Sequence, residues 1–319
     1  MASAQGWVTD FLERSEGGLN IDRVTDVAPG MDADGMLAIL GDERLGAQVI
    51  EAMTDLMHPT DSMYYDAIFG AFHGQVAIRN WLVPVMGEIS FIEFAATAPS
   101  EVFTRDGGTS SIDEWQMWAN IGEERLPLPR GISTRHYEGG WVVWNADVYD
   151  TGAMRQPPPD AGEAPPLPEV PRTPWVSEPM AGAPRSDALQ EWLDTPGDQR
   201  GPLDHADIHT IMITPELGLD VDAVGPLFHP IESRLIEPAA EFVGQDTIRE
   251  HLSSRRENRT ALKLEQVGPP LFNGSCTTFE WLASDPKEDS PPIRGASVCR
   301  YRDGMIVYAA DYYDTAEAS

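Results

Sequence analysis

The chain repeats part of its own sequence, and this repeat limits the fold more than any other feature does. Residues 131–151 read GISTRHYEGGWVVWNADVYDT, and residues 295–315 read GASVCRYRDGMIVYAADYYDT. Ten of these 21 aligned positions are identical without a gap. The two segments start 164 residues apart (295 − 131). Solenoid repeats have periods of roughly 20–50 residues, so we interpret the repeat as two copies of one domain.

The similarity continues upstream in a fixed order: a His-Pro pair, a Phe-x-Gly-Gln-x-x-Ile-Arg segment and a Glu-Trp pair. These matches begin at His58, Phe72 and Glu114 in the first copy, and at His229, Phe242 and Glu280 in the second. Between the copies, ten of the 28 residues from Pro157 to Pro184 are proline, a composition typical of an extended linker. We therefore predict an N-terminal arm (1–34), a first domain (35–151), a linker (152–185) and a second domain (186–319).

Within the first copy, the hydrophobic pattern predicts helices followed by strands. Residues 45–57 carry an apolar stripe at helical spacing, and residues 75–83 form a second short helix after Gly74. Runs of β-branched and aromatic residues predict strands over 90–95, 101–104, 111–118, 132–137 and 141–149. Glycine-containing turns at 138–140 and 302–304 predict that each copy ends in a hairpin. This order is typical of an α+β domain with its helices on one face of the sheet.

The composition excludes several classes of function. The chain carries 52 Asp and Glu against 22 Lys and Arg, a formal charge of −30, which disfavours nucleic acid and anionic membrane surfaces as partners. It shows neither a secretory signal pattern nor an apolar run of about 20 residues, so we expect a cytoplasmic protein. Cys276 and Cys299 are too few for a four-cysteine zinc site. They could pair if their strands adjoin, although a reduced pair is the simpler interpretation.

The end of each copy resembles a known superfamily. The segment 311–314, Asp-Tyr-Tyr-Asp, follows Gly304-Met305-Ile306-Val307 and is similar to the last strand of nuclear transport factor 2-like proteins. This superfamily includes SnoaL-like polyketide cyclases, ketosteroid isomerases and limonene-epoxide hydrolases. The resemblance covers roughly residues 40–151 and 187–315. It implies two tandem cone-shaped domains, each a curved antiparallel sheet closed by helices. It also implies a site without metal or cofactor, and homo-oligomers are frequent in the superfamily.

The resemblance also implies roles for individual residues. Asp147 and Asp311 fall where the superfamily keeps an acid–base aspartate. Tyr64 and Asp66 fall where the epoxide hydrolases hold the reactive water with a tyrosine and an asparagine, and Glu237 falls near the general base of the ketosteroid isomerases. Those hydrolases also need an Arg-x-Asp motif on a middle strand. This chain has Trp115 and Met117 there, and Trp281 and Ala283 in the second copy, so we do not expect epoxide hydrolysis.

The residues themselves support a role for Asp147. It lies between Ala146 and Val148, and strand alternation places Asn145, Asp147 and Tyr149 on one face. A carboxylate that faces a core is costly unless it is paired or functional, and an apolar pocket would raise its pKa. The alternative is that this face is solvated. The same two interpretations apply to Asp311 in the second copy.

Three other titratable residues are weaker candidates. Asp66 could share acid and base roles with Asp147, because two carboxyl groups on opposite walls of one pocket acquire different pKa values. Its alternative role is to accept hydrogen bonds from local backbone amides. Glu237 precedes a proline in the second copy. His73 could titrate near neutrality, although a histidine before a helix is more often a surface or cap residue.

Aromatic residues crowd the first copy, with tryptophan at positions 81, 115, 118, 141 and 144. Many aromatics belong to a core, but this number also indicates a pocket that stacks flat rings. From this set and its neighbours we expect five substrate-binding residues: Tyr64, Tyr65, Trp115, Trp118 and Asn145. His205 and His209 lie four apart and would align on a helix as metal ligands. A third ligand is not obvious, so we interpret this segment as an acidic surface turn.

These features predict a cofactor-independent acid–base enzyme that acts on a hydrophobic aromatic small molecule. The chain as a whole resembles the bacterial diarylpropane lyases, which release a hydroxymethyl carbon as formaldehyde and leave a stilbene. A polyketide cyclase or isomerase is the alternative enzyme, and a non-catalytic small-molecule-binding module is the alternative of another class. We expect the first copy to hold the working site, because the second has Leu235 and Val243 in place of Tyr64 and His73.

Overall fold

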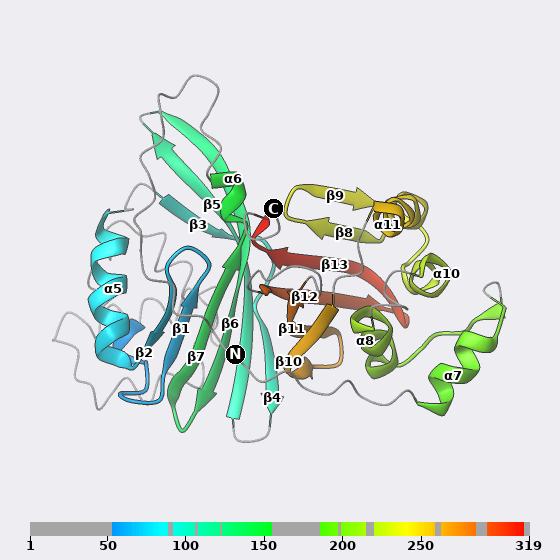
Figure 1. Ribbon diagram of the computed structural model, residues 1–319, viewed down its shortest axis with the longest axis horizontal. Coiled ribbons are helices and arrows are strands. Elements are labelled where there is room, and N and C mark those ends of the chain that lie inside the picture. Colours follow the sequence, from blue (N-terminus) through cyan, green and yellow to red (C-terminus); the bar gives the residue numbers. More distant parts are fainter. Residues whose placement is uncertain are drawn as a thin grey trace. The chain divides into compact units, whose positions relative to one another are not determined.

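The computed structural model divides the chain into two compact units, Met1–Trp175 and Val176–Ser319 (Figure 1). It describes residues 53–88, 92–105, 108–121, 123–154, 186–196, 199–214, 220–258, 263–284 and 292–315. The predicted N-terminal arm, residues 45–52 of the first predicted helix and residues 155–185 of the predicted linker lie outside the described residues. Residues 53–55 of that helix are helical, as predicted.

The first unit is a mixed sheet with one long helix beside it. In chain order its elements are β1 (Met63–Asp66), β2 (Gly70–His73), α5 (Gln75–Glu88), β3 (Ile92–Ala96), β4 (Glu101–Arg105), β5 (Gly108–Ile121), β6 (Glu124–Glu138), β7 (Trp141–Tyr149) and α6 (Thr151–Met154). The strands lie in the order β2-β1-β7-β6-β5-β3, and β4 also pairs with β5. All neighbours are antiparallel except β1 and β7, which are parallel.

The second unit starts with helices and ends with a sheet of the same strand order. Its elements are α7 (Asp187–Asp194), α8 (His205–Ile213), α10 (Val221–Val224), a 3-10 turn (Gly225–Leu227), β8 (Arg234–Glu237), β9 (Ala240–Val243), α11 (Gln245–Asn258), β10 (Lys263–Phe272), β11 (Cys276–Ser284), β12 (Ile293–Arg302) and β13 (Met305–Tyr313). The strand order is β9-β8-β13-β12-β11-β10, with β8 and β13 parallel. Each of these strands takes the place that its counterpart takes in the first sheet.

The α+β class is confirmed, with three departures from the predicted elements. Each sheet is open and contains one parallel pair, where we expected antiparallel strands throughout. Strand β6 begins at Glu124 and not near Ile132; Pro127 and Pro129 concealed its first half, because proline inside a run argues against a strand. Helix α5 continues to Glu88 past Pro84, one turn beyond the predicted end.

The repeated His-Pro pairs build the same turn in both units. The Nδ1 atom of His58 accepts hydrogen bonds from two backbone amides, two and three residues further on, at 3.4 and 3.0 Å. His229 does the same at 3.3 and 3.1 Å. The side chains of Gln75 and Gln245 each donate to two backbone carbonyls near this turn. The sequence identity upstream of the strands is therefore explained by local hydrogen bonding.

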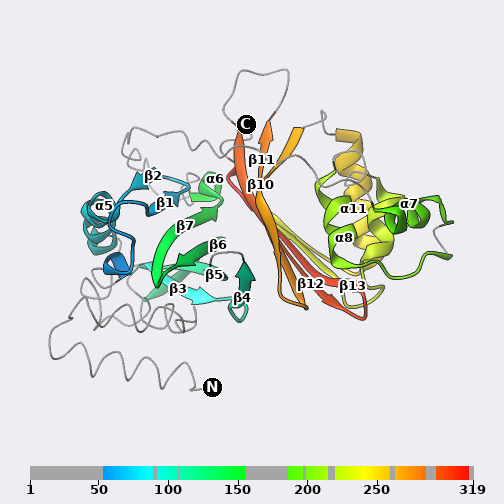
Figure 2. The same cartoon turned by 90° about the horizontal axis from the view of Figure 1, so that it is seen from below.

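In both units, helices pack on one face of the sheet (Figure 2). In the first unit, Ile78 and Leu82 of α5 pack with Tyr64 of β1 and Val142 of β7. In the second unit, a larger apolar cluster joins α7, α8, α10 and α11 to β8, β12 and β13. These helices cover the sheet face that carries the candidate residues described below.

Cys276 and Cys299 are buried, and neither forms a disulfide. Strands β11 and β12 adjoin, but Cys276 lies opposite Arg300, and Cys299 lies opposite Thr277. The one-residue offset turns the two thiols to opposite faces of the sheet, because side chains alternate along a strand. The reduced pair is therefore the interpretation that the structure supports.

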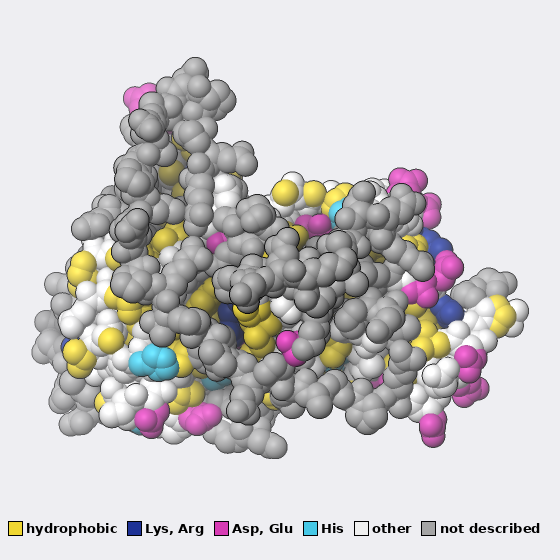
Figure 3. Space-filling view, viewed as in Figure 1, with side chains coloured by type: hydrophobic (Ala, Val, Ile, Leu, Met, Phe, Trp, Pro, Cys, Tyr) yellow, Lys and Arg dark blue, Asp and Glu magenta, His cyan; other side chains and the backbone are white. Residues whose placement is uncertain are grey.

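Acidic side chains are visible on the described surface of both units (Figure 3), in keeping with the formal charge of −30. Among the described residues, every helix is too short or too polar to cross a lipid bilayer.

A glycine in each unit makes room for a tryptophan. A Cβ atom built on Gly131 would lie 2.2 Å from the indole ring of Trp115, and one built on Gly295 would lie 2.1 Å from that of Trp281. Atoms cannot approach so closely, so a larger residue would displace the ring. Both glycines belong to the repeated segment, and their identity in the two copies thus has a steric cause.

We predict that Gly131→Ala destabilises the protein by about 1–3 kcal/mol, the usual cost of overpacking a filled core. Gly87→Ala is the matched control: Gly87 lies in α5, where an added Cβ meets nothing within 4 Å. That substitution should stabilise by up to ~1 kcal/mol, because alanine favours the helix. Urea unfolding of the three proteins measures both values. Equal stability of Gly131→Ala and the parent protein would contradict the steric explanation.

Candidate functional site

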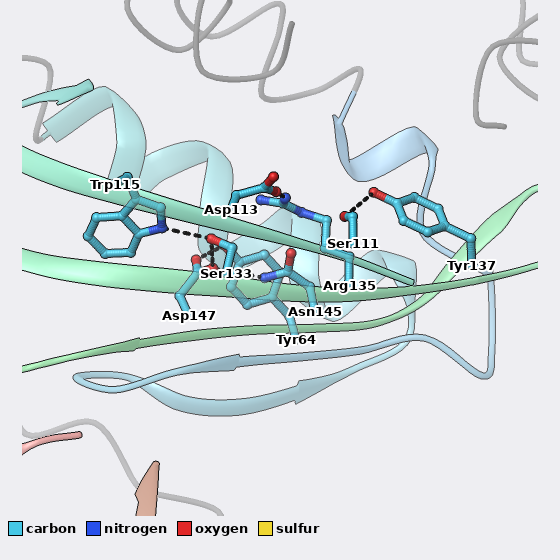
Figure 4. Close-up of polar contacts among 9 residues, drawn as sticks. All are labelled: Tyr64, Ser111, Asp113, Trp115, Ser133, Arg135, Tyr137, Asn145 and Asp147. Atoms are coloured by element: carbon cyan, nitrogen blue, oxygen red, sulfur yellow. Dashed lines mark hydrogen bonds and ion pairs between the residues drawn. The ribbon is translucent and has the colours of Figure 1, made fainter. Parts of the chain in front are cut away.

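Four polar side chains form a row across the covered face of the first sheet. Asp113 of β5 lies opposite Ser133 of β6, Ser133 lies opposite Asp147 of β7, and Asp147 lies beside Asp66 of β1. Residues directly opposite on neighbouring strands point to the same face. We call these four residues the polar row. Figure 4 shows that two of them, Ser133 and Asp147, lie with Tyr64 and Asn145 in one hydrogen-bonded network, whereas Asp113 is paired with Arg135.

Asp147 is the most strongly bonded member of the polar row. Its Oδ1 accepts from the Ser133 hydroxyl at 2.6 Å and from the Asn145 amide at 3.2 Å, and its Oδ2 accepts from the Tyr64 hydroxyl. Asp147 is half-buried, and its carboxyl group is paired within the sheet face. The three donors hold both carboxyl oxygens in a fixed orientation.

The proton of Ser133 has a fixed direction. The indole Nε1–H of Trp115, which can only donate, reaches the Ser133 oxygen at 2.9 Å. Ser133 therefore accepts from Trp115 and donates its own proton to Asp147. Trp115 is 3% exposed and lies against Gly131. This arrangement orients Asp147 through a chain of hydrogen bonds from the core.

Asp66 is buried, and its surroundings favour the protonated form of its carboxyl group. Burial and, secondarily, the charge of Asp147 raise its pKa from 3.8 to about 7, against hydrogen bonds from the amides of Ile68 and Phe69 and from Tyr149. The amides donate to Oδ1 at 2.8 and 2.9 Å, and the Tyr149 hydroxyl lies 3.2 Å from both oxygens. Near neutral pH, Asp66 is thus able to hold a proton and release it.

Asp66 therefore has a carboxyl group with a raised pKa inside the first unit. The alternative role of Asp66, accepting from local amides, is also observed, because it binds both amides while it lies beside Asp147. The two roles coexist in one side chain.

Two tyrosines keep their protons beside these carboxyls. Burial first, and then the charge of Asp147, raises the pKa of Tyr64 well above 10. Burial first, and then the charge of Asp66, does the same to the pKa of Tyr149. Each tyrosine is therefore a hydrogen-bond donor to one aspartate over the physiological pH range.

The structure adds residues that the sequence did not identify. Arg135 of β6, two residues along the strand from Ser133, forms a buried ion pair with Asp113. Asp113 Oδ1 and Trp81 Nε1 are buried without a hydrogen-bond partner among the described residues. The ring of Trp81 packs edge-on against that of Tyr64, with ring centres 5.1 Å apart.

Three predicted site residues lie away from the polar row. His73 is exposed and pairs with Met63, which points to the other face of β1 from Tyr64. Tyr65 also points to that other face, because it lies between Tyr64 and Asp66. Trp118 follows a bulge in β5 and carries the Arg125 guanidinium 4.2 Å above its ring.

The tryptophans do not form one aromatic pocket. Trp115 and Trp81 flank the polar row, Trp141 packs edge-on against His58, and Trp144 stacks on His136. Most of these tryptophans therefore pack against other side chains at separate places in the unit. The wall beside the row is made by Trp115 with Tyr149 and Phe94, whose ring centres lie 5.6 and 5.5 Å from the indole.

The second unit holds Asp311 in the same way and surrounds it differently. Trp281 Nε1–H donates to Ser297 at 2.9 Å, and Ser297 donates to Asp311 at 2.6 Å. Leu235 takes the place of Tyr64. Oε2 of Glu237 lies 3.2 Å from Nε2 of His251 of α11. His251 was not identified from the sequence, because its partner lies 14 residues away, beyond the reach of a local motif.

His205 and His209 lie on α8, so the interpretation as a surface turn is wrong. His209 is buried, and its ring packs edge-on against Phe279 at 4.5 Å. His205 contacts Phe272 and Tyr301. Within the described ranges, the structure contains no cluster of three or more His, Cys, Asp or Glu that could bind a metal ion.

Comparison with known proteins gave no matching family model and no matching curated protein. Several solved structures are similar. A hypothetical protein with a ketosteroid isomerase-like fold from Catenulispora acidiphila is 20% identical, over 34% of this chain and 85% of its own, with a TM-score of 0.29. A SnoaL-like protein from Agrobacterium tumefaciens is 19% identical, over 34% and 97%, at 0.30. An NTF2-like protein from Cytophaga hutchinsonii is 11% identical, over 38% and 98%, at 0.29.

The raised pKa of Asp66 predicts how stability depends on pH. Between its ordinary pKa of 3.8 and its folded-state pKa of about 7, the folded protein holds a proton that the unfolded chain has lost. The free energy of unfolding should therefore fall as pH rises through this window, by at most about 4 kcal/mol from this group. Asp66→Asn should remove that contribution and be the more stable protein at pH 8.

Chemical denaturation at pH 4.5 and pH 8 measures this difference. The matched control is Glu123→Gln, which neutralises an exposed carboxyl group in the same unit and should leave the pH dependence unchanged. If Asp66→Asn retained the full pH dependence of the parent protein, the raised pKa would be wrong.

Proposed function

We propose that the first unit is a cofactor-independent acid–base catalyst in which Asp66 is the general acid and Asp147 is the general base. The observation that carries this proposal is their arrangement in register on adjacent strands. One carboxyl has a pKa of about 7, and the other receives three hydrogen bonds. Two such groups can donate and accept protons in one turnover.

The surroundings favour an aromatic substrate. Trp115, Tyr149, Met117 and Ala67 form an apolar cluster beside the polar row, and Trp81 lies on the other side of Tyr64. Flat rings pack well against such a wall. The Trp81 indole N–H can donate to a substrate oxygen. The formal charge of −30 also favours an uncharged or cationic substrate over an anionic one.

Within this class we propose a lyase that acts on a 1,2-diarylpropane-1,3-diol with a para-hydroxyl group. Asp66 gives its proton to the benzylic hydroxyl, which leaves as water, while the phenol releases its proton to solvent water, and a quinone methide forms. Asp147 then takes the proton of the terminal hydroxyl. The C–C bond breaks, formaldehyde leaves, and the electron pair forms the stilbene double bond and restores the phenolate. The phenolate regains a proton, and proton return from Asp147 to Asp66 completes the cycle.

A polyketide cyclase or isomerase would use the same two carboxyls to move a proton next to a carbonyl group. A binding module would use them only as hydrogen-bond partners. The substrate distinguishes these functions. Incubation with a racemic 1,2-diarylpropane-1,3-diol should release formaldehyde and stilbene in a 1:1 ratio, and the analogue methylated at the para-hydroxyl should give neither. Product formation from polyketide or steroid substrates alone would support the isomerase class instead.

We predict that the two aspartates differ in their effect on activity. Asp147→Asn should lower kcat/KM by at least ~10², the lower end for an essential acid–base group. Asp311→Asn, in the second unit, should cost much less. Asparagine is nearly isosteric, so circular dichroism should show an intact fold in both variants. If Asp311 were essential and Asp147 dispensable, the working site would lie in the second unit.

We also predict that catalysis is independent of metal. Dialysis against a chelator should leave kcat and KM unchanged, because the proposed steps need only the two carboxyls. If activity were lost and added zinc restored it, this expectation would be wrong, and His205 and His209 would again be candidate metal ligands.

A further inference from the structure

A buried histidine in the second unit has one nitrogen without a partner. His209 of α8 is 4% exposed. Its Nε2 lies 3.1 Å from Oε1 of Gln266, whereas its Nδ1 is buried and has no hydrogen-bond partner among the described residues. A buried polar atom without a partner costs free energy, so such an atom indicates a place for a ligand or a water molecule.

The network around Gln266 determines which nitrogen carries the proton. Gln266 Nε2 donates to the carbonyl of Gly268 at 2.5 Å, which turns Oε1 toward His209. An amide oxygen only accepts, so His209 Nε2 must donate to it. Burial lowers the pKa of His209, although the hydrogen bond to Gln266 opposes this effect. The imidazole is then neutral, and Nδ1 presents a lone pair that can accept a hydrogen bond.

His209 lies at one end of a row that corresponds to the polar row of the first unit. Its ring packs on Phe279, Phe279 lies opposite Ser297, and Ser297 lies opposite Asp311. The next register step of β8 is Glu237, which His251 contacts. Three strand spacings, or about 14 Å, separate Phe279 from Glu237.

The aromatic residues beside this row are partly accessible. Trp281 and Tyr313 lie with ring centres 5.8 Å apart, and both retain intermediate exposure, as does Asp311. By contrast, Leu235, Cys299 and Ala309 are buried under the helices. Flat rings can therefore reach the Trp281 end of the face, while the remainder is filled core.

We infer that the second unit contains a binding site for an uncharged two-ring aromatic alcohol, whose hydroxyl group donates to Nδ1 of His209 while its rings contact Phe279 and Trp281. The site differs from that of the first unit, which has Asp113 in the place of Phe279 and a paired arginine beside it. His209 selects a hydrogen-bond donor, because its free atom is an acceptor. The inference does not depend on catalysis in the first unit.

The test uses 2-naphthol as the probe and 2-methoxynaphthalene, which lacks the donor, as its matched control. In protein labelled with ¹⁵N-histidine, the free His209 ring should show the neutral tautomer protonated at Nε2. Adding 2-naphthol should shift the His209 Nδ1 resonance, and 2-methoxynaphthalene should not. The same titration of Asp147→Asn should give an unchanged His209 response, which separates this site from the first unit.

Variants test the hydrogen bond directly. His209→Phe should weaken 2-naphthol binding at this site about three- to tenfold, the usual contribution of one hydrogen bond, and should preserve 2-methoxynaphthalene binding. His205→Phe, one helical turn earlier, is the matched control and should have no effect. If His209→Phe fails to fold, Gln266→Met is the second variant. It keeps the imidazole but removes the acceptor that holds the proton on Nε2, so it should also weaken 2-naphthol binding.

Three results would overturn the inference. A proton on Nδ1 in the free protein would remove the acceptor. Equal responses of His209 to the two probes would show that the hydroxyl group is not recognised. No response of His209 to either probe would show that water alone occupies this position.

Discussion

Within each unit, the position of the central aspartate depends on one chain of contacts. A tryptophan lies on a glycine and donates to a serine, which in turn donates to the aspartate. Trp115, Ser133 and Asp147 form it in the first unit. The glycine allows the indole ring to lie flat on the neighbouring strand. The donor-only indole fixes the direction of the serine proton. Because the chain begins in the core, the aspartate at its end has a defined position and a defined set of donors.

The two units use this chain with different neighbours. In the first, Tyr64 adds a third donor, and the carboxyl of Asp66 lies beside Asp147. In the second, the tyrosine position is Leu235, and imidazoles from α8 and α11 approach the row from its two ends. One scaffold thus presents the same aspartate to two kinds of surroundings, one rich in carboxyls and one rich in rings.

The α+β class, the hairpins and the face that carries Asp147 could be predicted from sequence, because each depends on local alternation and turn residues. Gly131 and Ser133 are matched by the same residue types in the second copy, and this match is visible in the sequence. The strand register was needed to explain it. The roles of Arg135 and His251 could not be predicted, because each is paired with a residue on another element. The raised pKa of Asp66 also required the structure, since burial causes most of it.

The parallel pairing of β1 with β7 has a consequence for how the protein folds. Asp66 and Asp147 become neighbours only when the first strand of the sheet meets the last, 81 positions later in the chain (147 − 66). Such a contact has a high sequence separation, and contacts of this kind form slowly because the intervening chain must be ordered first. During synthesis, neither unit can assemble its acidic centre until that unit's final hairpin has emerged, so a chain that stops before the hairpin lacks the centre.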